Sequence, residues 1–386
     1  MTLVPGVFLS NPIPERANGV SGGVESDAPV RLTDDLDALR AGIDHRLAEY
    51  LEAQRAEHLK HHVFRALYDD VTEFVCRPGK RIRPLLFLLA DRVFGQGRSP
   101  VPPESLLSIG ASLELLHAFI LVHDDIIDRA ETRRGRPTLH RLIEGRLSSF
   151  TDRDRAGRNL ALVLGDVLFA LAQRCLLETP LPGTTAARLG TLLLGCMVDT
   201  GFGEVADIVH STRDVAKVSP EEIEQMYCLK TTCYTIESPL AMAAVLHGVN
   251  AAGVEALGRI ARPAGLAFQI QNDLQEFARF EVSDADVPAD ILEGKKTLLM
   301  RTAYDLLNEN DRGFLQLCFS ANTQTEGTLS KARELITKSG AVGRLTVRVE
   351  ELFAQADEET QRAPFASEVQ AGLLALVQLV KDLARR

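Results

Sequence analysis

The spacing of apolar residues constrains this chain most strongly, because it has the period of a helix almost throughout. From Leu32 onward, apolar side chains recur at three- and four-residue intervals, as on one face of a helix. Alternating runs bounded by turn dipeptides, which mark strands, are missing. Breaks rich in glycine, proline and polar residues fall at residues 77–79, 95–103, 148–158, 179–183 and 281–294. The pattern predicts an all-α protein, a single bundle of about ten or more helices.

The ends of the chain and its cysteines indicate the kind of protein. Residues 1–30 are rich in Gly, Pro, Ser and Asn without a helical period, so we expect a disordered N-terminal extension before one helical domain at residues 31–386. The N-terminus lacks the features of a secretory signal, and no uncharged apolar run is long enough for a transmembrane segment. Six cysteines occur without a CxxC pair, which predicts reduced thiols in a cytoplasmic protein.

The charge balance excludes one class of partner. Hydrophobic residues make up 45% of the chain and charged residues 25%, an ordinary balance for a soluble globular protein. The formal net charge is -10, which argues against nucleic acid as a partner. An anionic small substrate would therefore need cations gathered locally at its site.

An aspartate-rich segment ends the apolar helix expected over residues 103–129. Asp124 and Asp128 are four residues apart, so they share one face of the helix, whereas Asp125 points elsewhere and would serve an outer shell. Hard oxygen ligands at this spacing suit Mg²⁺, which shares its shell with water and substrate phosphates. Taken alone, the motif could equally be a helix cap or a solvated acidic turn.

The arginines that follow favour a diphosphate site. Arg133, Arg134 and Arg136 put guanidinium groups beside the carboxylates, as a metal-bound diphosphate would require. The run DDIIDRAETRRG resembles the first aspartate-rich motif of the trans-isoprenyl diphosphate synthases, the polyprenyl synthetase family, and the resemblance extends over about residues 77–297. It implies antiparallel helices around a central cavity, a homodimer, and condensation of isopentenyl diphosphate with an allylic diphosphate (dimethylallyl, geranyl or farnesyl).

Three further segments match motifs of that family. PGKRIRP, residues 78–84, is similar to its GGKRxRP loop, so the resemblance implies that Lys80, Arg83, His117 and Arg134 bind isopentenyl diphosphate. Without it, the loop would be a basic solvated turn and His117 a core histidine. GEVADI, residues 203–208, has Glu204 where the family usually has Gln. In YCLKTTCYTIESPL the resemblance assigns contact with the allylic diphosphate to Lys230 and with the developing carbocation to Thr231.

The second aspartate-rich motif departs from the family. GLAFQIQNDLQEF keeps the family's Phe268 and Gln269, but its FQxxDDxxD becomes Asn272, Asp273 and Glu276. The position of Asn272 would hold a third Mg²⁺ through a weaker amide ligand. A family lysine upstream of DILEGKKT is also missing, since residues 281–292 contain neither Lys nor Arg. We interpret the joint loss of a carboxylate and an ammonium as paired retuning of the site.

By resemblance, three Mg²⁺ ions activate the allylic diphosphate. The implied metal ligands are Asp124, Asp128 and Asn272, with Asp125, Asp273 and Glu276 around them, and Gln269 belongs to the catalytic set. Arg133, Lys230 and Lys295 would neutralise the leaving diphosphate. Phe119 lies about 7.5 Å along the helix axis from Asp124, where an aromatic blocks the elongation pocket in the family. With Ile120 beside it, a C20 product is favoured over C15, although Phe119 could be simple core packing.

Two other functions remain open from the sequence. A class I terpene cyclase has the same fold and an Asn-containing second motif. That motif, however, requires a hydroxyl side chain at the position of Glu276 and an acidic one at the position of Phe280. A cyclase also has no use for the PGKRIRP loop. A weakly active partner subunit of a prenyl synthase would explain the two motif departures.

Overall fold

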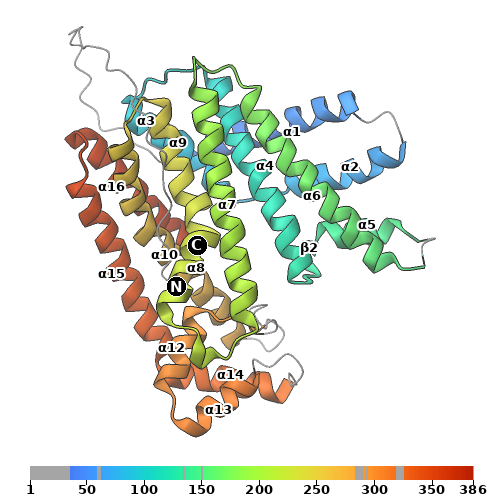
Figure 1. Cartoon of the computed structure of the whole chain (residues 1–386), viewed down its shortest axis with the longest axis vertical. Helices are drawn as coiled ribbons and strands as arrows, with labels where there is room; N and C mark the ends of the chain where they lie inside the picture. Colours follow the sequence, from blue (N-terminus) through green and yellow to red (C-terminus); the bar gives the residue numbers. More distant parts are fainter. Residues whose placement is uncertain are drawn as a thin grey trace.

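The computed structural model describes residues 35–58, 62–133, 135–148, 151–282, 291, 294–318 and 326–385. It confirms the all-α prediction (Figure 1). The helices are α1 (Leu36–His58), α2 (His62–Val75), α3 (Ile82–Gly95), α4 (Pro103–Ile127), α5 (Leu139–Arg146), α6 (Arg153–Leu177), α7 (Thr185–Ser211), α8 (Pro220–Tyr227), α9 (Ser238–Leu246), α10 (Ala251–Val282), α12 (Leu298–Leu306), α13 (Glu309–Cys318), α14 (Glu326–Ser339), α15 (Ala341–Arg362) and α16 (Ser367–Arg385). A 3-10 turn, η1 (Val215–Lys217), precedes α8, and a π-helix, η2 (Cys228–Glu237), joins α8 to α9.

The helix breaks expected at residues 77–79, 95–103 and 179–183 are observed, whereas most of the break expected at residues 281–294 lies outside the described residues. The break at residues 148–158 is shorter than predicted, because α6 begins at Arg153, where the Asp152 side chain accepts a hydrogen bond from the Arg155 backbone N–H. The sequence analysis did not predict the small sheet of β1 (Thr132–Arg133) and β2 (Arg136–Pro137), which pair antiparallel. Strands of two residues are too short to show alternation. The predicted extension at residues 1–30 lies outside the described residues.

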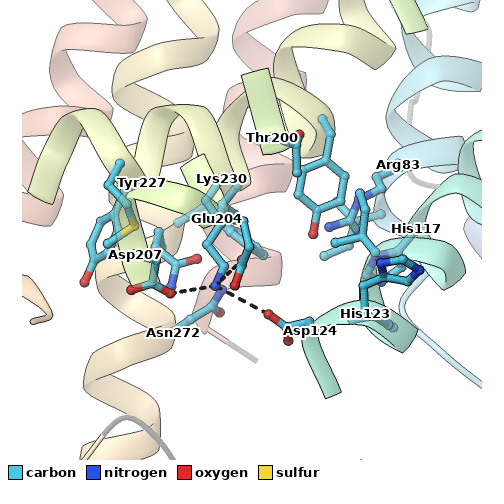
Figure 2. Close-up of a pocket in the computed structure, with 18 of the residues that line it drawn as sticks. Arg83, His117, His123, Asp124, Thr200, Glu204, Asp207, Tyr227, Lys230 and Asn272 are labelled. Carbon is cyan, nitrogen blue, oxygen red and sulfur yellow. Dashed lines mark hydrogen bonds and ion pairs between the residues drawn. The ribbon is translucent and has the colours of Figure 1, made fainter. Parts of the chain in front are cut away.

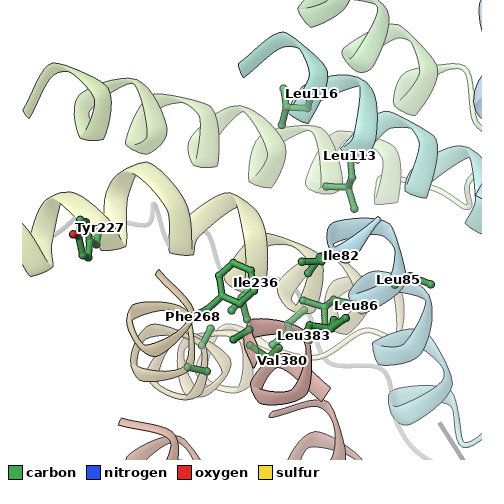
Figure 3. Close-up of a cluster of buried hydrophobic side chains, with 14 of the residues drawn as sticks. Ile82, Leu85, Leu86, Leu113, Leu116, Tyr227, Ile236, Phe268, Val380 and Leu383 are labelled. Atoms are coloured by element: carbon green, nitrogen blue, oxygen red, sulfur yellow. The ribbon is translucent and has the colours of Figure 1, made fainter. Parts of the chain in front are cut away.

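The core of the bundle forms where α3, α4, η2, α10 and α16 converge. Side chains that meet there are Leu85, Leu86, Leu113, Ile236, Phe268 and Val380 (Figure 3). Helix α4 packs lengthwise on α6, and α10 packs on both α15 and η2. Two helices that belong to opposite sides of the bundle, α4 and α10, therefore carry the two acidic motifs toward its interior.

Two described helices, α4 and α6, reach the length and mean hydropathy of a membrane span. Most of α4, 72% of its apolar window, is buried, as in a core helix, whereas only 39% of the α6 window is buried. The apolar side chains that remain exposed lie mainly on α6 and α7, which are neighbours in the bundle. This face is apolar without being part of the core.

Candidate active site

A cavity of about 640 Å³ opens between α3, α4, α7, η2 and α10. The sequence-predicted residues that line it are Lys80, Arg83, His117, Phe119, Asp124, Arg133, Lys230, Thr231, Gln269, Asn272, Asp273, Glu276 and Lys295. Asp128 joins them through Lys295, whose Nζ lies 2.7 Å from an Asp128 carboxylate oxygen. Asp125 is buried beside the cavity wall, and Arg134 lies outside the described residues. The structure thus brings together residues that are up to 215 positions apart, from Lys80 to Lys295.

The C-terminal end of α4 forms one acidic edge of the cavity. The helix ends at Ile127, two residues earlier than predicted, and Arg129 adopts a left-handed backbone conformation with φ of 52°. The backbone N–H of Asp128 still donates to the carbonyl of Asp124 at 2.8 Å, so the four-residue register continues through the helix cap. Asp124 and Asp128 therefore remain one helical turn apart, as the spacing predicts.

Arg133 links this edge to the strand β1. Its Nε donates to Asp125 at 2.7 Å and its Nη2 to Asp124 at 2.9 Å, so one guanidinium orients both carboxylates. Burial raises the pKa of Asp125 to about 6, and Arg133 opposes that rise. The Asp125 side chain is only 1% exposed, which leaves Asp124 as the member of the pair that faces the cavity.

Lys230 lies at the centre of the site, where three carboxylates surround its ammonium group. Its Nζ lies 2.6 Å from Asp207, 2.7 Å from Glu204 and 3.4 Å from Asp124, which Figure 2 shows as three dashed lines converging on one ammonium. Burial lowers the pKa of Lys230, but Asp207 and Asp124 more than offset this and hold the pKa above its ordinary value. The lysine is therefore charged and joins α4 to α7.

Close contact between α7 and the π-helix makes this arrangement possible. A Cβ on Gly203 would lie 2.3 Å from the backbone nitrogen of Lys230, so only glycine fits between the two backbones. Glu204 and Asp207 are three residues apart on α7 and share the face that meets Lys230. A π-helix inserts extra backbone into a helical run, as occurs often at functional sites.

Helix α10 supplies the opposite edge. Asn272 is half-buried and faces the carboxylates of α4 and α7 across the cavity (Figure 2). Asp273 is buried and accepts hydrogen bonds from the Tyr227 hydroxyl and, at 2.8 Å, from the Gln269 amide. Glu276 is exposed at the rim. Both oxygens of Asp273 are thus engaged by neighbours, whereas Asn272 presents its side chain to the cavity.

In the basic segment that leads into α3, Arg83 and Lys80 make different contacts. Arg83 donates to the Thr235 hydroxyl at 2.8 Å, and its guanidinium carbon lies 4.1 Å from the centroid of the Tyr234 ring. Lys80 is exposed, and its ammonium donates to the carbonyl of Leu383 at 3.1 Å. Both line the cavity.

Arg81, between these two cations, has a structural role. It is buried and pairs with Glu114 and Asp44, each at 2.7 Å. His117 lies near Arg83, because its ring is 6.0 Å from the same tyrosine ring. Arg81 also lines the cavity, but its guanidinium is engaged by Glu114 and Asp44, so Lys80 and Arg83 are the candidates for binding a ligand.

Sequence reasoning missed three residues of the site. Asp207 belongs to the GEVADI segment, and its position three residues after Glu204 was a usable signal. Tyr227 anchors Asp273 and also accepts a hydrogen bond from the backbone N–H of Leu298 at 3.1 Å. Tyr234 stacks under Arg83. Both tyrosines act through residues distant in the chain, so local spacing gives no sign of them.

The oxygen donors at the cavity suit hard cations whose coordination shell is completed by a bound ligand. Within the described part of the chain, no three Asp, Glu, His or Cys side chains converge as a closed metal site. Asp124 and Asp128 offer carboxylate oxygens on one side of the cavity, and Asn272 offers an amide oxygen on the other. Mg²⁺ is typically held by one or two carboxylates together with substrate phosphates. Open acidic edges with cations between them are compatible with that chemistry.

Comparison with known proteins agrees with these features. The chain is 30% identical over 271 residues to the short chain isoprenyl diphosphate synthase of Methanothermobacter thermautotrophicus, covering 68% of this chain and 74% of that protein. It is 28% identical over 275 residues to the geranylgeranyl diphosphate synthase of Sulfolobus acidocaldarius, covering 70% and 77%. The crystal structure of geranylgeranyl pyrophosphate synthase from Corynebacterium glutamicum, complexed with isoprenyl diphosphate and magnesium, superposes with a TM-score of 0.81 at 28% identity, covering 91% of this chain and all of that one.

The family profile gives the same result independently of any single relative. The profile described as Polyprenyl synthetase matches residues 65–336, which include both aspartate-rich motifs, the basic loop and the π-helix. The chain belongs to the polyprenyl synthetase family.

Proposed function

We propose that this chain is a magnesium-dependent prenyltransferase that condenses isopentenyl diphosphate with an allylic diphosphate to give a short trans-prenyl diphosphate. The observation that carries this proposal is the position of two separate cation groups on one cavity. Lys230, Arg133 and Lys295 stand among the carboxylates, while Lys80 and Arg83 stand at the basic loop. Two diphosphates, one metal-bound and one free, would each find a complementary group.

The allylic diphosphate belongs to the acidic side. We assign Mg²⁺, three ions in all, to Asp124, Asp128 and Asn272, with Asp125, Asp273 and Glu276 supporting them. Bound Mg²⁺ would neutralise the leaving diphosphate and so ease the breaking of the allylic C–O bond. Lys230 and Arg133 add fixed positive charge on the same leaving group. Thr231, which follows Lys230 in the π-helix, lies at the cavity wall where the carbocation would develop.

Isopentenyl diphosphate belongs to the basic side. Lys80, Arg83 and His117 would bind it, and Arg134 is assigned there on the resemblance alone. The Tyr234 ring and the Thr235 hydroxyl fix the Arg83 guanidinium, so a diphosphate meets a cation that is already oriented. Apolar lining from residues such as Ile82, Ile120 and Phe268 keeps water from quenching the cation.

We propose that the wall of the cavity limits the length of the product. Phe119 is among the residues that line it, together with Ile120. A ring at this place limits the growing chain, so we propose a C20 product in preference to C15. Replacing Phe119 with Ala should lengthen the product.

One assay tests the function. The protein is incubated with Mg²⁺, isopentenyl diphosphate and dimethylallyl, geranyl or farnesyl diphosphate, and the products are identified by mass. A longer diphosphate that contains isopentenyl units supports the proposal. A hydrocarbon without isopentenyl units would instead identify a cyclase, and no turnover with any starter would point to a partner subunit.

The apolar face of α6 and α7 supports a homodimer. Its members include Val163 on α6 and Val198 and Phe202 on α7, which are 58%, 58% and 65% exposed. A contiguous apolar surface of this kind is typical of a protein interface. Phe202→Glu should yield a monomer in light scattering, whereas Val347→Glu, at a 59% exposed valine on α15, should leave the assembly intact. A Phe202→Glu protein of unchanged mass would contradict this interface.

A further inference from the structure

Three aromatic rings from two helices meet at the wall of the cavity. The ring centroid of Phe119 lies 5.2 Å from that of Phe169 on α6 and 4.6 Å from that of His123 on α4. Tilted ring pairs at these distances are favourable contacts. Phe119 and His123 line the cavity, whereas Phe169 is not among its lining residues and stands beside Phe119 on the neighbouring helix.

The His123 ring, which also contacts Phe119, is itself packed against α6. A Cβ on Gly165 would lie 2.5 Å from the His123 ring, so the backbone of α6 approaches that ring as closely as glycine allows. His123 also lies 3.5 Å from Asp166. Helix α6 thus contacts the ring cluster at two levels, at Gly165 through His123 and at Phe169 directly.

These contacts determine where the Phe119 ring can go. A phenyl side chain on a helix has few rotamers, and neighbouring rings decide which of them is occupied. His123 and Phe169 both contact the Phe119 ring, so the position of that ring at the cavity depends on them. Without the Phe169 ring, Phe119 would gain space toward α6 and could move away from the growing chain.

We propose that Phe169 is a positioning residue for product length: it holds the Phe119 ring in place as the end wall of the elongation cavity. The inference rests on the proposed synthase function and adds a residue that never touches the substrate. Phe169 acts through Phe119, and its removal therefore affects product length only while Phe119 is present.

The test compares the products of four proteins from the same starter: wild type, Phe169→Ala, Phe119→Ala and the double variant. We expect Phe169→Ala to raise the ratio of products longer than C20 to C20 severalfold. The double variant should match Phe119→Ala alone. Leu168→Ala is the matched control, because Leu168 is the preceding residue, fully buried in the core. It should lower the unfolding midpoint without changing the product ratio.

Each other outcome has a definite meaning. An unchanged ratio in Phe169→Ala, or a double variant that makes longer products than Phe119→Ala, overturns the inference. An unchanged ratio in Phe119→Ala also overturns it, while the synthase function stands if isopentenyl units are added. A wild-type protein that adds none overturns both. Phe169→Leu, which removes the ring but fills most of its volume, gives the same readout if Phe169→Ala does not fold.

Discussion

Replacing Lys230 with Met should cost about 3 kcal/mol of the free energy of unfolding. The ammonium lies within 3.4 Å of three carboxylates, and its side chain is 18% exposed, against 7% for Asp207. Removing one partner from a buried ion pair costs about 3–5 kcal/mol, because the remaining charge stays buried and unpaired. The lower value applies here, since Asp124 retains Arg133. With an unfolding entropy on the order of 0.8 kcal/mol/K for 386 residues, the midpoint should fall by about 4 °C.

The dependence on pH follows from the direction of the shift. Burial lowers the pKa of Lys230, and Asp207 and Asp124 raise it further than burial lowers it, so the folded-state pKa exceeds the unfolded value. A lysine whose pKa is raised on folding stabilises the folded state fully at any pH below the pKa of the unfolded chain, about 10.4. This stabilisation is lost only as the pH rises through the pKa of the folded state. The difference between variant and wild type should therefore be constant from pH 7 to 9. It should shrink toward pH 5, where protons can neutralise the carboxylates left behind.

Thermal or denaturant unfolding in EDTA measures this difference without bound metal. The matched control is Lys381→Met, which breaks an equally short pair with Glu350 at 2.6 Å. Glu350 is 46% exposed, so this pair is worth only about 0–1 kcal/mol. If Lys230→Met is no more destabilising than Lys381→Met, the three carboxylates do not depend on the ammonium, and the account of the site is wrong.

Two further predictions concern single residues. Asn272→Asp should raise neither the rate nor the apparent Mg²⁺ affinity, because no added lysine balances the new carboxylate. The rate is measured as a function of Mg²⁺ concentration, and a gain in both quantities would exclude paired retuning. Arg81→Met should cost about 3–5 kcal/mol in chemical denaturation, since Glu114 is buried and loses its cation, and a loss below about 1 kcal/mol would show that Glu114 is satisfied in another way.

The helices were predictable because burial on one face leaves a period in the sequence. Helix α4, from Pro103 to Ile127, is an example, with both its start and its acidic end marked by residue type. The β1–β2 hairpin was missed because two residues carry no period. The π-helix was not predicted, because the helical period of the sequence does not distinguish Cys228–Glu237, which packs against α7 and α10, from an ordinary helix.

The site could be predicted as far as its local motifs extend. The four-residue spacing of Asp124 and Asp128 fixes their common face in any helix. The contact of Lys230 with Asp207 spans 23 residues, and that of Arg83 with Thr235 spans 152. Pairings across such sequence distances depend on how the helices pack against one another. The spacing of residues along a single helix carries no information about that packing. The long-range contacts of the site therefore had to come from the structure.

The absence of a side chain at Gly203 allows the close approach of α7 and the π-helix that positions this site. A Cβ there would lie 2.3 Å and 2.6 Å from the backbone N and Cα of Lys230, atoms that cannot rotate away. In Gly203→Ala, α7 and the π-helix must separate, so Lys230 should withdraw from Glu204 and Asp207, and both turnover and stability should fall.

Gly313→Ala on α13 is the matched control, because a Cβ there meets nothing within 4 Å and α13 is not part of the apolar face of α6 and α7. An exposed Gly→Ala change inside a helix should stabilise the protein by about 0.5–1 kcal/mol. The predicted signs are therefore opposite for the same substitution at two helical glycines. If unfolding midpoints and initial rates respond alike in the two variants, helix propensity governs both positions, and close backbone contact at Gly203 does not hold Lys230 in place.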